Sequence, residues 1–253
     1  MNDSGRFDNK AALITGAASG IGRAISLRLA SEGARVLGHD LNAEGLAETA
    51  ALVRAAGGTM EGRTGDVSQP DECRAAVAAC VETFGRLDVL GNNAGIARAE
   101  HVTDVTPEQY RRMMGVNVDG YFFMAQAAIP HLLETDGNIV NVASNAGLMG
   151  QAYTVVYCMT KGAVVQLTRA LAMEYVKTNL RVNAIAPSGI QTTLSEQFQI
   201  PKDIDFDLMR PYMGFRPMGS PDDIAAMFAF VACDEGRSVH GAILAVDRGV
   251  TAG

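Results

Sequence analysis

The stretch AALITGAASGIG, residues 11–22, joins a short apolar run to a glycine-rich turn. The run Ala11–Thr15 predicts a strand covered on both faces, and the periodic segment Ile21–Ser31 predicts a helix that begins at the turn. Glycines let the backbone turn tightly and approach a ligand, and the free N–H groups at a helix start suit a pyrophosphate. Such a turn can be purely structural, but its place between the first strand and a helix favours phosphate binding. The cofactor-binding residues predicted in the turn are Gly16, Ser19, Gly20, Ile21 and Gly22.

Strand-like and helix-like segments alternate from one end of the chain to the other. Continuous apolar runs indicate strands that are covered by helices on both faces, as in a parallel sheet. We therefore expect one α/β domain over residues 1–253, a Rossmann-type doubly wound sheet of seven parallel strands with helices on both faces. The predicted strands are Ala11–Thr15, Arg35–His39, Thr59–Thr64, Leu87–Leu90, Asn138–Val142, Leu180–Ile185 and Ala242–Val246. The predicted helices are Ile21–Ser31, Ala43–Ala56, Pro70–Phe84, Pro107–Leu133, Tyr153–Lys177 and Pro221–Ala232.

One long stretch, residues 191–219, interrupts this alternation. It lies between the sixth strand and the last helix and carries apolar side chains such as Phe198, Met209 and Phe215. Long insertions in compact domains usually form lids or binding loops. A poorly ordered surface loop is the alternative interpretation, and the many apolar side chains favour a lid over a substrate.

The composition of the 253-residue chain excludes several classes of protein. A formal net charge of −7 argues against nucleic-acid binding, and a hydrophobic content of 48% argues against disorder. No stretch is long and apolar enough to span a membrane, and the polar first ten residues are neither a signal nor a transit peptide. The spacing of the cysteines and histidines predicts packed thiols and no metal site, so we expect a cytoplasmic protein. These residues are Cys73, Cys80, Cys158, Cys233, His39, His101, His131 and His240.

An acidic residue, Asp40, ends the second predicted strand, about twenty residues beyond the glycine-rich turn. A carboxylate in this place can accept hydrogen bonds from the adenosine ribose hydroxyls and would repel a 2′-phosphate. Neither Ser19 nor Leu41 offers a cation to offset that repulsion. We therefore predict that Asp40 and Leu41 bind the adenosine end of NAD in preference to NADP. A cap for the following helix is the alternative interpretation of Asp40.

Tyr157 and Lys161 are four residues apart in a helical segment, so they share one face of the helix. A free phenol titrates near pH ~10, and a neighbouring ammonium lowers that pKa, which lets a tyrosine act as a base near neutral pH. By itself such a pair could equally be a solvated surface pair. Ser144 follows the fifth predicted strand, at the carboxyl end where ligands collect in parallel sheets. Its hydroxyl can hold a substrate oxygen beside the tyrosine.

Taken together, these motifs resemble the classical short-chain dehydrogenase/reductase family over essentially the full chain. The resemblance implies an NAD-dependent oxidoreductase that interconverts a secondary alcohol and a ketone by hydride transfer. Tyr157 would be the general acid/base, and Asn117, Ser144 and Lys161 would complete the catalytic set, although a buried asparagine inside a helix is more often structural. The matching motifs are Thr15-Gly-x-x-x-Gly-x-Gly22, Asp66-Val67, Asn92-Asn93-Ala94-Gly95, Asn117, Ser144 and Tyr157-x-x-x-Lys161.

The same resemblance implies roles for residues whose spacing alone carries no chemistry. Lys161 would also hold the nicotinamide ribose, and Asn117 would position a water in a proton relay that leads from Tyr157 to solvent. The stretch 183–192 resembles the nicotinamide-side motif of the family, in which Ile190 and Thr192 hold the carboxamide. The further cofactor-binding residues implied are Asp66 and Val67 at the adenine, Asn93, Ala94 and Gly95 at the adenosine ribose, and Pro187 at the nicotinamide.

Two positions depart from the family pattern. Ser188 stands where a glycine usually follows the proline, which would shift the backbone near the nicotinamide slightly. Arg248 replaces the first glycine of a terminal Asp-Gly-Gly, in a part of the chain that often packs at a subunit contact in the family. Neither departure removes a catalytic group.

The substrate class is narrowed by the lack of basic residues in two stretches of the chain. Family members that reduce 3-oxoacyl-carrier proteins usually prefer NADP and carry basic residues near the fifth strand and on the catalytic helix. This chain has Thr135-Asp136-Gly137-Asn138 and Met173-Glu174 there, so we prefer a small to medium, largely apolar alcohol or ketone. The alternatives are the carrier-protein reductase, an epimerase or dehydratase, and a nucleotide-binding sensor without turnover. The predicted substrate-side residues are Ser144, Leu148, Met149, Gln151 and Tyr153.

The two longest helical segments, Pro107–Leu133 and Tyr153–Lys177, exceed what the sheet of one domain requires. The family resemblance implies that they pair across a two-fold axis. We therefore expect a homo-oligomer, a tetramer or a dimer, with a small-molecule substrate and no nucleic-acid or membrane partner.

Overall fold

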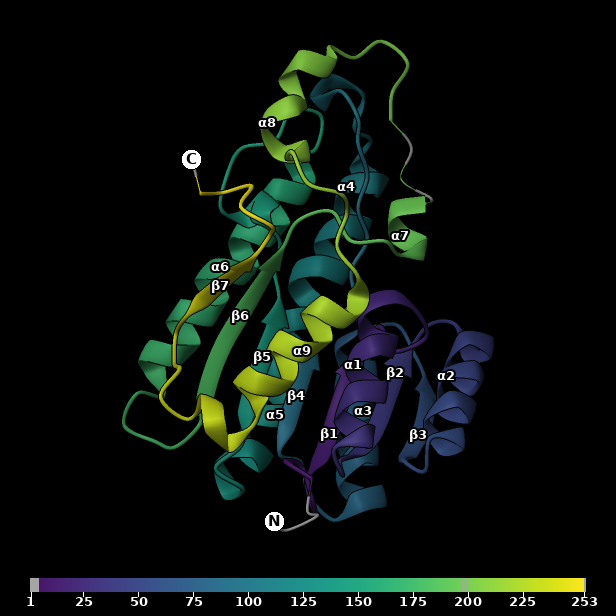
Figure 1. Ribbon diagram of the computed structural model, residues 1–253, viewed down its shortest axis with the longest axis vertical. Coiled ribbons are helices and arrows are strands. Elements are labelled where there is room, and N and C mark those ends of the chain that lie inside the picture. Colours follow the sequence, from purple (N-terminus) through teal and green to yellow (C-terminus); the bar gives the residue numbers. More distant parts are fainter. Residues whose placement is uncertain (1–4, 197, 199, 253) are drawn as a thin grey trace.

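The computed structural model of the chain describes residues 5–196, 198 and 200–252. One seven-stranded parallel sheet, with the strand order β3-β2-β1-β4-β5-β6-β7, forms its centre (Figure 1). The predicted fold class is confirmed. The predictions made for residues 1–4, for residues 197 and 199 of the predicted lid and for residue 253 of the predicted domain lie outside the described residues. The strands are β1 (Ala11–Thr15), β2 (Arg35–Asp40), β3 (Thr59–Thr64), β4 (Val89–Asn92), β5 (Asn138–Val142), β6 (Arg181–Pro187) and β7 (Ile243–Val246).

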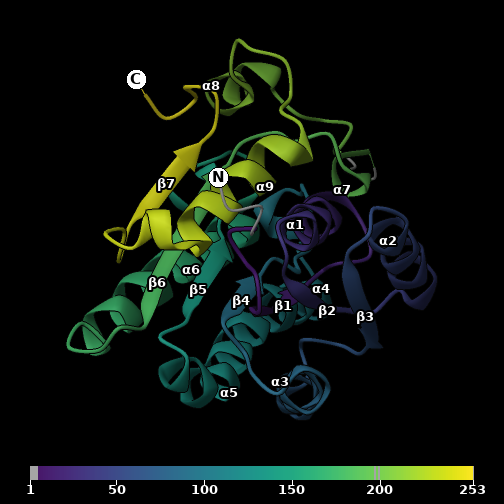
Figure 2. The ribbon, with the colours of Figure 1, turned by 60° about the horizontal axis from the view of Figure 1, so that its bottom comes forward.

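Helices cover both faces of the sheet, as the continuous apolar strands require. One buried cluster joins α1, α2 and α9 to the sheet, and the other joins α3, α5 and α6 to its opposite face. Figure 2 shows α1 and α9 on one side of the strands and α3 and α5 on the other. The long helices are α1 (Gly20–Ser31), α2 (Ala43–Ala55), α3 (Pro70–Phe84), α4 (Pro107–Met114), α5 (Gly120–Glu134), α6 (Val155–Glu174) and α9 (Pro221–Ala232).

The strand order reverses between β1 and β4, which are neighbours in the sheet although two strands separate them in the chain. Ligands of open parallel sheets bind in the crevice at the carboxyl ends of the strands, at such a reversal. The glycine-rich turn after β1 and the Asn92–Gly95 stretch after β4 both lie there. Two short helices of the predicted lid, α7 (Thr193–Glu196) and α8 (Arg210–Met213), lie beyond the same ends (Figure 1).

Two of the predicted helices differ from the structure. The predicted helix Pro107–Leu133 is divided by a π-helical segment, Gly115–Asp119, because one extra residue is accommodated in that turn. The predicted helix Tyr153–Lys177 begins only at Val155, because Tyr153 has a positive φ of 65° that no right-handed helix accommodates. β3 also differs in burial, since it is an edge strand with most of its side chains exposed.

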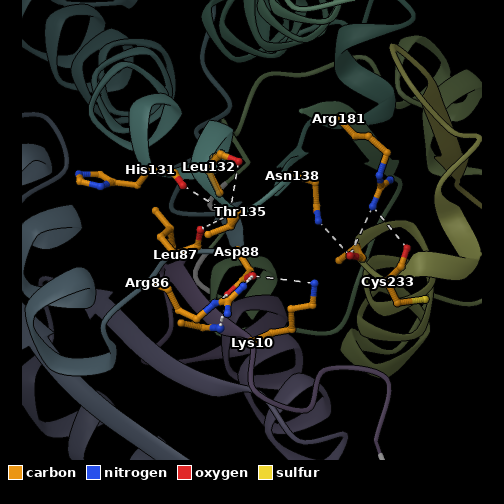
Figure 3. A network of polar contacts seen from close by, with 12 residues as sticks. Lys10, Arg86, Leu87, Asp88, His131, Leu132, Thr135, Asn138, Arg181 and Cys233 are labelled. Carbon is orange, nitrogen blue, oxygen red and sulfur yellow. Dashed lines mark hydrogen bonds and ion pairs between the residues drawn. The ribbon is translucent and has the colours of Figure 1, made fainter. Parts of the chain in front are cut away.

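A polar network ties the chain together at the opposite, amino edge of the sheet (Figure 3). Asp88 accepts a hydrogen bond from the Ala11 N–H at 2.8 Å and forms an ion pair with Arg86. Arg181 donates to main-chain carbonyls at the end of α9, including that of Val231 at 2.8 Å. A cavity of about 400 Å³ opens at this edge, and its lining contains none of the predicted site residues. This edge therefore joins the start of β1 to the end of α9, and the predicted site residues lie at the other edge.

The described residues include no helix that combines the length and the apolar character needed to cross a bilayer.

Candidate active site

The glycine-rich turn has the geometry of a phosphate cradle. Gly16 and Gly20 have positive φ values of 68° and 52°, which side chains rarely adopt. A Cβ on Gly22 would come within 2.0 Å of the Gly16 carbonyl oxygen, so only glycine fits there. α1 begins at Gly20, and the side chain of its N-cap residue, Ser19, makes no capping hydrogen bond within the described chain. The N–H groups of the first turn of α1 and the Ser19 hydroxyl are therefore available to a pyrophosphate.

Asp40 holds its carboxylate beside this turn. Its Oδ2 accepts a hydrogen bond from the Ala18 N–H at 3.0 Å, and its Oδ1 accepts one from the Asn42 N–H at 2.9 Å. Each oxygen keeps free lone pairs for the hydroxyls of a ribose. The cap of α2 is Asn42, whose side chain accepts from the Gly45 N–H, so the interpretation of Asp40 as the helix cap is wrong. Leu41, next to Asp40, is exposed.

The ends of β1 and β4 are joined by Thr15. Its hydroxyl accepts hydrogen bonds from the N–H groups of Asn93 and Ala94, at 2.9 and 3.0 Å. The Asn93 amide in turn donates to the Thr15 carbonyl at 3.1 Å. These bonds hold the Asn93–Gly95 stretch against the glycine-rich turn, where the resemblance places the adenosine ribose.

Asp66 is clamped by a residue that the sequence did not indicate. Arg112 of α4 donates to Asp66 Oδ2 at 2.7 Å and to the Ser68 hydroxyl at 3.0 Å. Burial alone would raise the pKa of Asp66, but the hydrogen bonds from Ser68 and Arg112 bring it below its ordinary value. Val67 next to it is buried. No pattern in the sequence could reveal Arg112, because its contact with Asp66 depends on how α4 packs over the loop after β3.

Ser144, Tyr157 and Lys161 come together at the end of β5. Ser144 is buried; its hydroxyl accepts from the Ala146 N–H at 3.1 Å and donates to Asn145 Oδ1 at 3.2 Å. Lys161 Nζ lies 5.8 Å from the centre of the Tyr157 ring and donates to the Val142 carbonyl at 2.8 Å. The structure thus places the predicted tyrosine, lysine and serine around one point.

The pKa values of the pair differ from the expectation. Burial raises the pKa of Tyr157, and the adjacent Ser144 hydroxyl opposes this only in part. Burial also lowers the pKa of Lys161 to about 7. Desolvation therefore dominates at both groups, and the predicted lowering of the Tyr157 pKa is not seen.

Asn117 lies in the π-helical segment, a feature that often marks functional sites. Its Oδ1 accepts from the Ile96 N–H at 2.9 Å, and its Nδ2 donates to the Ile96 carbonyl at 2.8 Å and to the Thr160 hydroxyl at 3.1 Å. A Cβ on Gly95 would lie 3.4 Å from Asn117 Oδ1 and 3.7 Å from Lys161 Nζ. The side chain of Asn117 therefore joins the loop after β4 to the catalytic helix.

The stretch 183–192, which resembles the nicotinamide-side motif of the family, ends beside the glycine-rich turn. Pro187 ends β6, and Ile190 is buried and forms an isolated parallel bridge with Gly219. Thr192 lies so close to the glycine-rich turn that a Cβ on Gly20 would be 3.1 Å from its methyl group. Ser188, one of the two departures, donates to the Asp247 carbonyl at 3.1 Å and so binds this stretch to the end of β7.

The second departure, Arg248, stabilises the base of the predicted lid. It has a positive φ of 58°, forms an ion pair with Asp223 at 2.8 Å and donates to the Pro217 carbonyl at 3.3 Å. Asp223 belongs to the capping box at the start of α9. Arg248 therefore connects the C-terminal segment to the point where the lid re-enters the fold.

The predicted substrate-side residues have different surroundings. Gln151 donates to Asn145 Oδ1 at 3.1 Å, and Leu148 is partly exposed. Tyr153 packs edge-on against His101 with ring centres 5.2 Å apart, and its hydroxyl accepts from the Asp205 N–H of the predicted lid at 2.8 Å. Tyr153 is thus tied to the lid by its hydroxyl.

A tyrosine absent from the sequence predictions lies behind the catalytic lysine. Tyr121, in the first turn of α5, is buried, and its ring centre is 5.2 Å from Lys161 Nζ. Its hydroxyl donates to the Val142 carbonyl at 2.9 Å and accepts from Lys161 Nζ at 3.3 Å. The only signal available in the sequence was its position four residues after Asn117, one helical turn further on.

Curated relatives match the chain along nearly its whole length. A family model described as enoyl-(acyl carrier protein) reductase matches residues 16–251. Meso-2,3-butanediol dehydrogenase of Serratia marcescens is 38% identical over 98% of this chain and 96% of its own. D-threitol dehydrogenase of Mycolicibacterium smegmatis is 37% identical over 97% of this chain and 94% of its own. A 3-oxoacyl-[acyl-carrier-protein] reductase of Thermotoga maritima is 34% identical over 97% of this chain and 99% of its own.

Solved structures share the fold at similar identity. A short-chain dehydrogenase from Mycobacterium paratuberculosis, bound to NAD, has a TM-score of 0.91 and 32% identity, and covers 98% of this chain and 100% of its own. A short-chain dehydrogenase from Burkholderia cenocepacia, in complex with NADP, has a TM-score of 0.88 and 34% identity, and covers 97% of this chain and 99% of its own. Proteins of this architecture therefore hold either dinucleotide.

Proposed function

The chain belongs to the classical short-chain dehydrogenase/reductase family, and we propose that it is an NAD-dependent dehydrogenase of secondary alcohols that also reduces the corresponding ketones. The residues present fit a dinucleotide: the turn after β1 is a cradle that a Cβ at Gly22 would fill, and Asp40 keeps free acceptors beside it. The bound dinucleotide would accept or supply the hydride, and the protein would supply position and proton transfer. The observation that carries the proposal is the meeting of Ser144, Tyr157 and Lys161 at the carboxyl edge.

The preference for NAD rests on the charges near Asp40. Arg23 is the cation close to the glycine-rich turn, and its guanidinium is already bound by Glu48 at 2.6 Å and by the Ala18 carbonyl at 2.7 Å. It also donates to Thr49 at 3.0 Å. A 2′-phosphate would therefore meet the Asp40 carboxylate with Arg23 already engaged, whereas a 2′-hydroxyl would find a hydrogen-bond acceptor. This arrangement supports NAD over NADP.

The proposed chemistry assigns one task to each side chain. Ser144 would hold the substrate oxygen by exchanging its bond to Asn145 for one to the substrate. Tyr157 would remove the hydroxyl proton during oxidation and return it during reduction. Lys161 would bind the nicotinamide ribose, and its ammonium would favour the Tyr157 phenolate once the site is closed. Asn117 would keep the loop at Ile96 in place and carry the water of the proton relay.

The substrate would be a small to medium, largely apolar alcohol. The relatives named for butanediol and threitol support the small size of this substrate, although both of those alcohols carry several hydroxyls. The segment 191–219 would cover this substrate as a lid, with Ile190 and Leu148 on its apolar walls. Its attachment to Tyr153 and Ala152, next to the catalytic helix, supports this role.

We further propose a cytoplasmic homo-oligomer, a tetramer or a dimer. Exposed apolar side chains lie on the outer surfaces of the helices that the family resemblance places at the contact: Phe122 on α5, and Met159 and Met173 on α6. The thiols of Cys73 and Cys80 are free and buried, and burial raises their pKa values to about 11 and about 12. Such thiols are packing groups, as expected in a reducing compartment.

The test is a panel of secondary alcohols assayed for NADH and NADPH formation, with Tyr157→Phe as the control. We expect turnover with NAD, and a loss of about 10²–10⁴-fold in kcat for the variant, the usual contribution of a general acid/base. Tight NAD binding without turnover above the variant would establish the nucleotide sensor instead. Preferential reduction of 3-oxoacyl-carrier protein with NADPH would establish the carrier-protein reductase, which the 34% identical relative represents.

A further inference from the structure

Lys161 is a buried cation without a carboxylate partner among the described residues. Its side chain is almost fully enclosed, and it forms no ion pair with Asp or Glu in the described part of the chain. A buried ammonium is costly unless acceptors surround it. Its acceptors are the Val142 carbonyl at 2.8 Å and the Tyr121 hydroxyl at 3.3 Å. The rings of Tyr121 and Tyr157 lie 5.2 and 5.8 Å from Nζ.

Tyr121 closes this arrangement from behind the site. Its hydroxyl donates to the same Val142 carbonyl that accepts from Lys161, at 2.9 Å, so three groups form a closed triangle of hydrogen bonds. The donor of Tyr121 is used by Val142, which leaves its oxygen turned as an acceptor toward Lys161. Its ring face adds an attraction for a nearby cation. The side chain of Tyr121 is held in one position, because it is buried in the first turn of α5 directly after the π-helical segment.

We infer that Tyr121 is a positioning residue for the proposed reaction: its hydroxyl and ring hold Lys161 in place and stabilise the protonated form of the lysine. The inference rests on the proposed function, because Lys161 matters there through its charge and its grip on the nicotinamide ribose. Tyr121 is buried behind Lys161, so it would act on the reaction through the lysine. It sets how much of Lys161 is charged near neutral pH and therefore how strongly Tyr157 is activated.

No carboxylate faces Lys161 among the described residues, and the polar groups around it come from four elements. From α6 these are Tyr157 and, beside it, Cys158; from α5 it is Tyr121. The π-helical segment contributes the uncharged amide of Asn117, and β5 contributes only the Val142 carbonyl. Burial lowers the pKa of Lys161 to about 7, so a small change in its surroundings alters its charge at neutral pH.

The variant Tyr121→Phe isolates this effect. It keeps the ring and removes the hydroxyl, so the lysine loses an acceptor and its pKa falls further. The charged fraction of Lys161 at pH 7 then decreases, and the acid limb of the kcat/KM profile for alcohol oxidation moves to higher pH. We expect a displacement of about half to one pH unit, from a long hydrogen bond to a charged group. Rates of wild type and variant should converge at a pH above both acid limbs, where Tyr157 is ionised in each protein.

Tyr175→Phe is the matched control. Tyr175 follows the end of α6, is partly buried against the core, and lies outside the set of groups that face Lys161. Thermal unfolding is recorded for wild type and both variants, because Tyr121→Phe also removes the hydrogen bond to Val142. A purely structural tyrosine would lower Tm and reduce the rate by the same factor at every pH. A Tyr121→Phe profile parallel to that of wild type and Tyr175→Phe therefore overturns the inference.

A binding measurement separates this inference from the proposed function. NADH affinity is measured by fluorescence from pH 5.5 to pH 9 for the same three proteins. We expect the midpoint of its pH dependence to lie about half a pH unit or more lower in Tyr121→Phe than in the other two. That result supports the inference even if wild type oxidises no alcohol, which would overturn the proposed function alone. Identical midpoints in all three proteins would overturn the inference even if turnover is robust.

Discussion

Asp40 and Arg112 show how single charged side chains define the adenosine end of the site. Asp40 is fixed by two main-chain N–H groups, so its carboxylate has one orientation before any ligand arrives. Arg112 fixes Asp66 in the same way from a different helix. Both carboxylates are therefore preorganised, which reduces the entropy lost when a dinucleotide binds. Single substitutions at Asp40 and at Arg112 test these two roles.

Replacing Asp40 by alanine should change the choice of cofactor. Loss of a charged hydrogen-bond acceptor costs about 1.5–3 kcal/mol, or roughly a tenfold to hundredfold drop in kcat/KM with NAD. The repulsion of a 2′-phosphate disappears as well, so kcat/KM with NADP should rise. Steady-state kinetics with both cofactors measure the ratio, and Asp40→Asn, which keeps one acceptor oxygen, should fall between alanine and wild type. A wild type that uses NADP as well as NAD would contradict the assignment of Asp40.

Replacing Arg112 by glutamine should weaken dinucleotide binding and leave kcat unchanged. Asp66 would lose its 2.7 Å partner and the adenine-side loop would loosen, which we expect to raise the Kd for NADH about 1.5-fold to fivefold, from a partly exposed ion pair. Arg111→Gln is the matched control, because Arg111 lies on the same turn, is exposed and has no ion-pair partner among the described residues. Equal affinities of the two variants would show that the clamp is unimportant.

At the scale of elements, the segment 191–219 is attached by two tyrosines to the loop that precedes α6. The Tyr212 hydroxyl donates to the Ala152 carbonyl at 2.8 Å, and the Tyr153 hydroxyl accepts from the Asp205 N–H at 2.8 Å. Tyr153 holds this contact in a left-handed backbone conformation that is unfavourable for a tyrosine. Strain of this kind tends to occur at functional sites. The two contacts keep α8 above the start of α6.

Tyr212→Phe should therefore loosen the lid. One neutral hydrogen bond contributes about 1 kcal/mol, so the closed arrangement should lose stability by a factor of about five. We expect KM for the alcohol to rise about twofold to fivefold with kcat little changed, because the residues around Tyr157 stay in place. Tyr175→Phe again serves as the control, and limited proteolysis of the segment reports opening directly. A fall in kcat at unchanged KM would mean that the segment acts on the chemistry and is not a cover.

The π-helical segment is the element that the sequence concealed. The apolar residues of Pro107–Leu133 predict one long helix, although the extra residue of the widened turn moves the residues after it by about 100° around the axis. The structure shows α4, the π-helical segment and α5 as successive pieces. That widened turn carries Asn117 and leads into Tyr121. Both side chains therefore form hydrogen bonds with residues of α6.

At the scale of the whole molecule, apolar side chains remain exposed on α6. Met173 is 71% exposed and Met159 is 50% exposed, which suits a contact between subunits. We expect light scattering after size exclusion to give a tetramer or dimer, and Met173→Glu to shift it toward smaller species. Leu52→Glu, on the exposed side of α2 and outside the proposed contact, should leave the mass unchanged. A monomeric wild type at micromolar concentration would refute the assembly.

The strands and helices could be predicted because their signals are local. Strand bounds agreed with the structure to within two residues, since β1 is a continuous apolar run and β4, β5 and β6 are mostly apolar. The spacing of Tyr157 and Lys161 placed them on one helix face, and the structure confirms this. Tyr121 and Arg112 could not be found, because the groups they contact lie 40 and 46 positions away in the chain.

The amino-acid sequence alone determined the doubly wound sheet, the position of the glycine-rich turn and the residue types of the candidate site, because periodicity, glycine spacing and motif order act over short stretches. Only the tertiary structure decided the pKa values of the site residues. It buried Lys161 and partly buried Tyr157, so that desolvation governs their pKa values, and it supplied Tyr121 as the acceptor behind the lysine. Burial depends on every element that packs around a group, and that information is absent from any one segment of the chain.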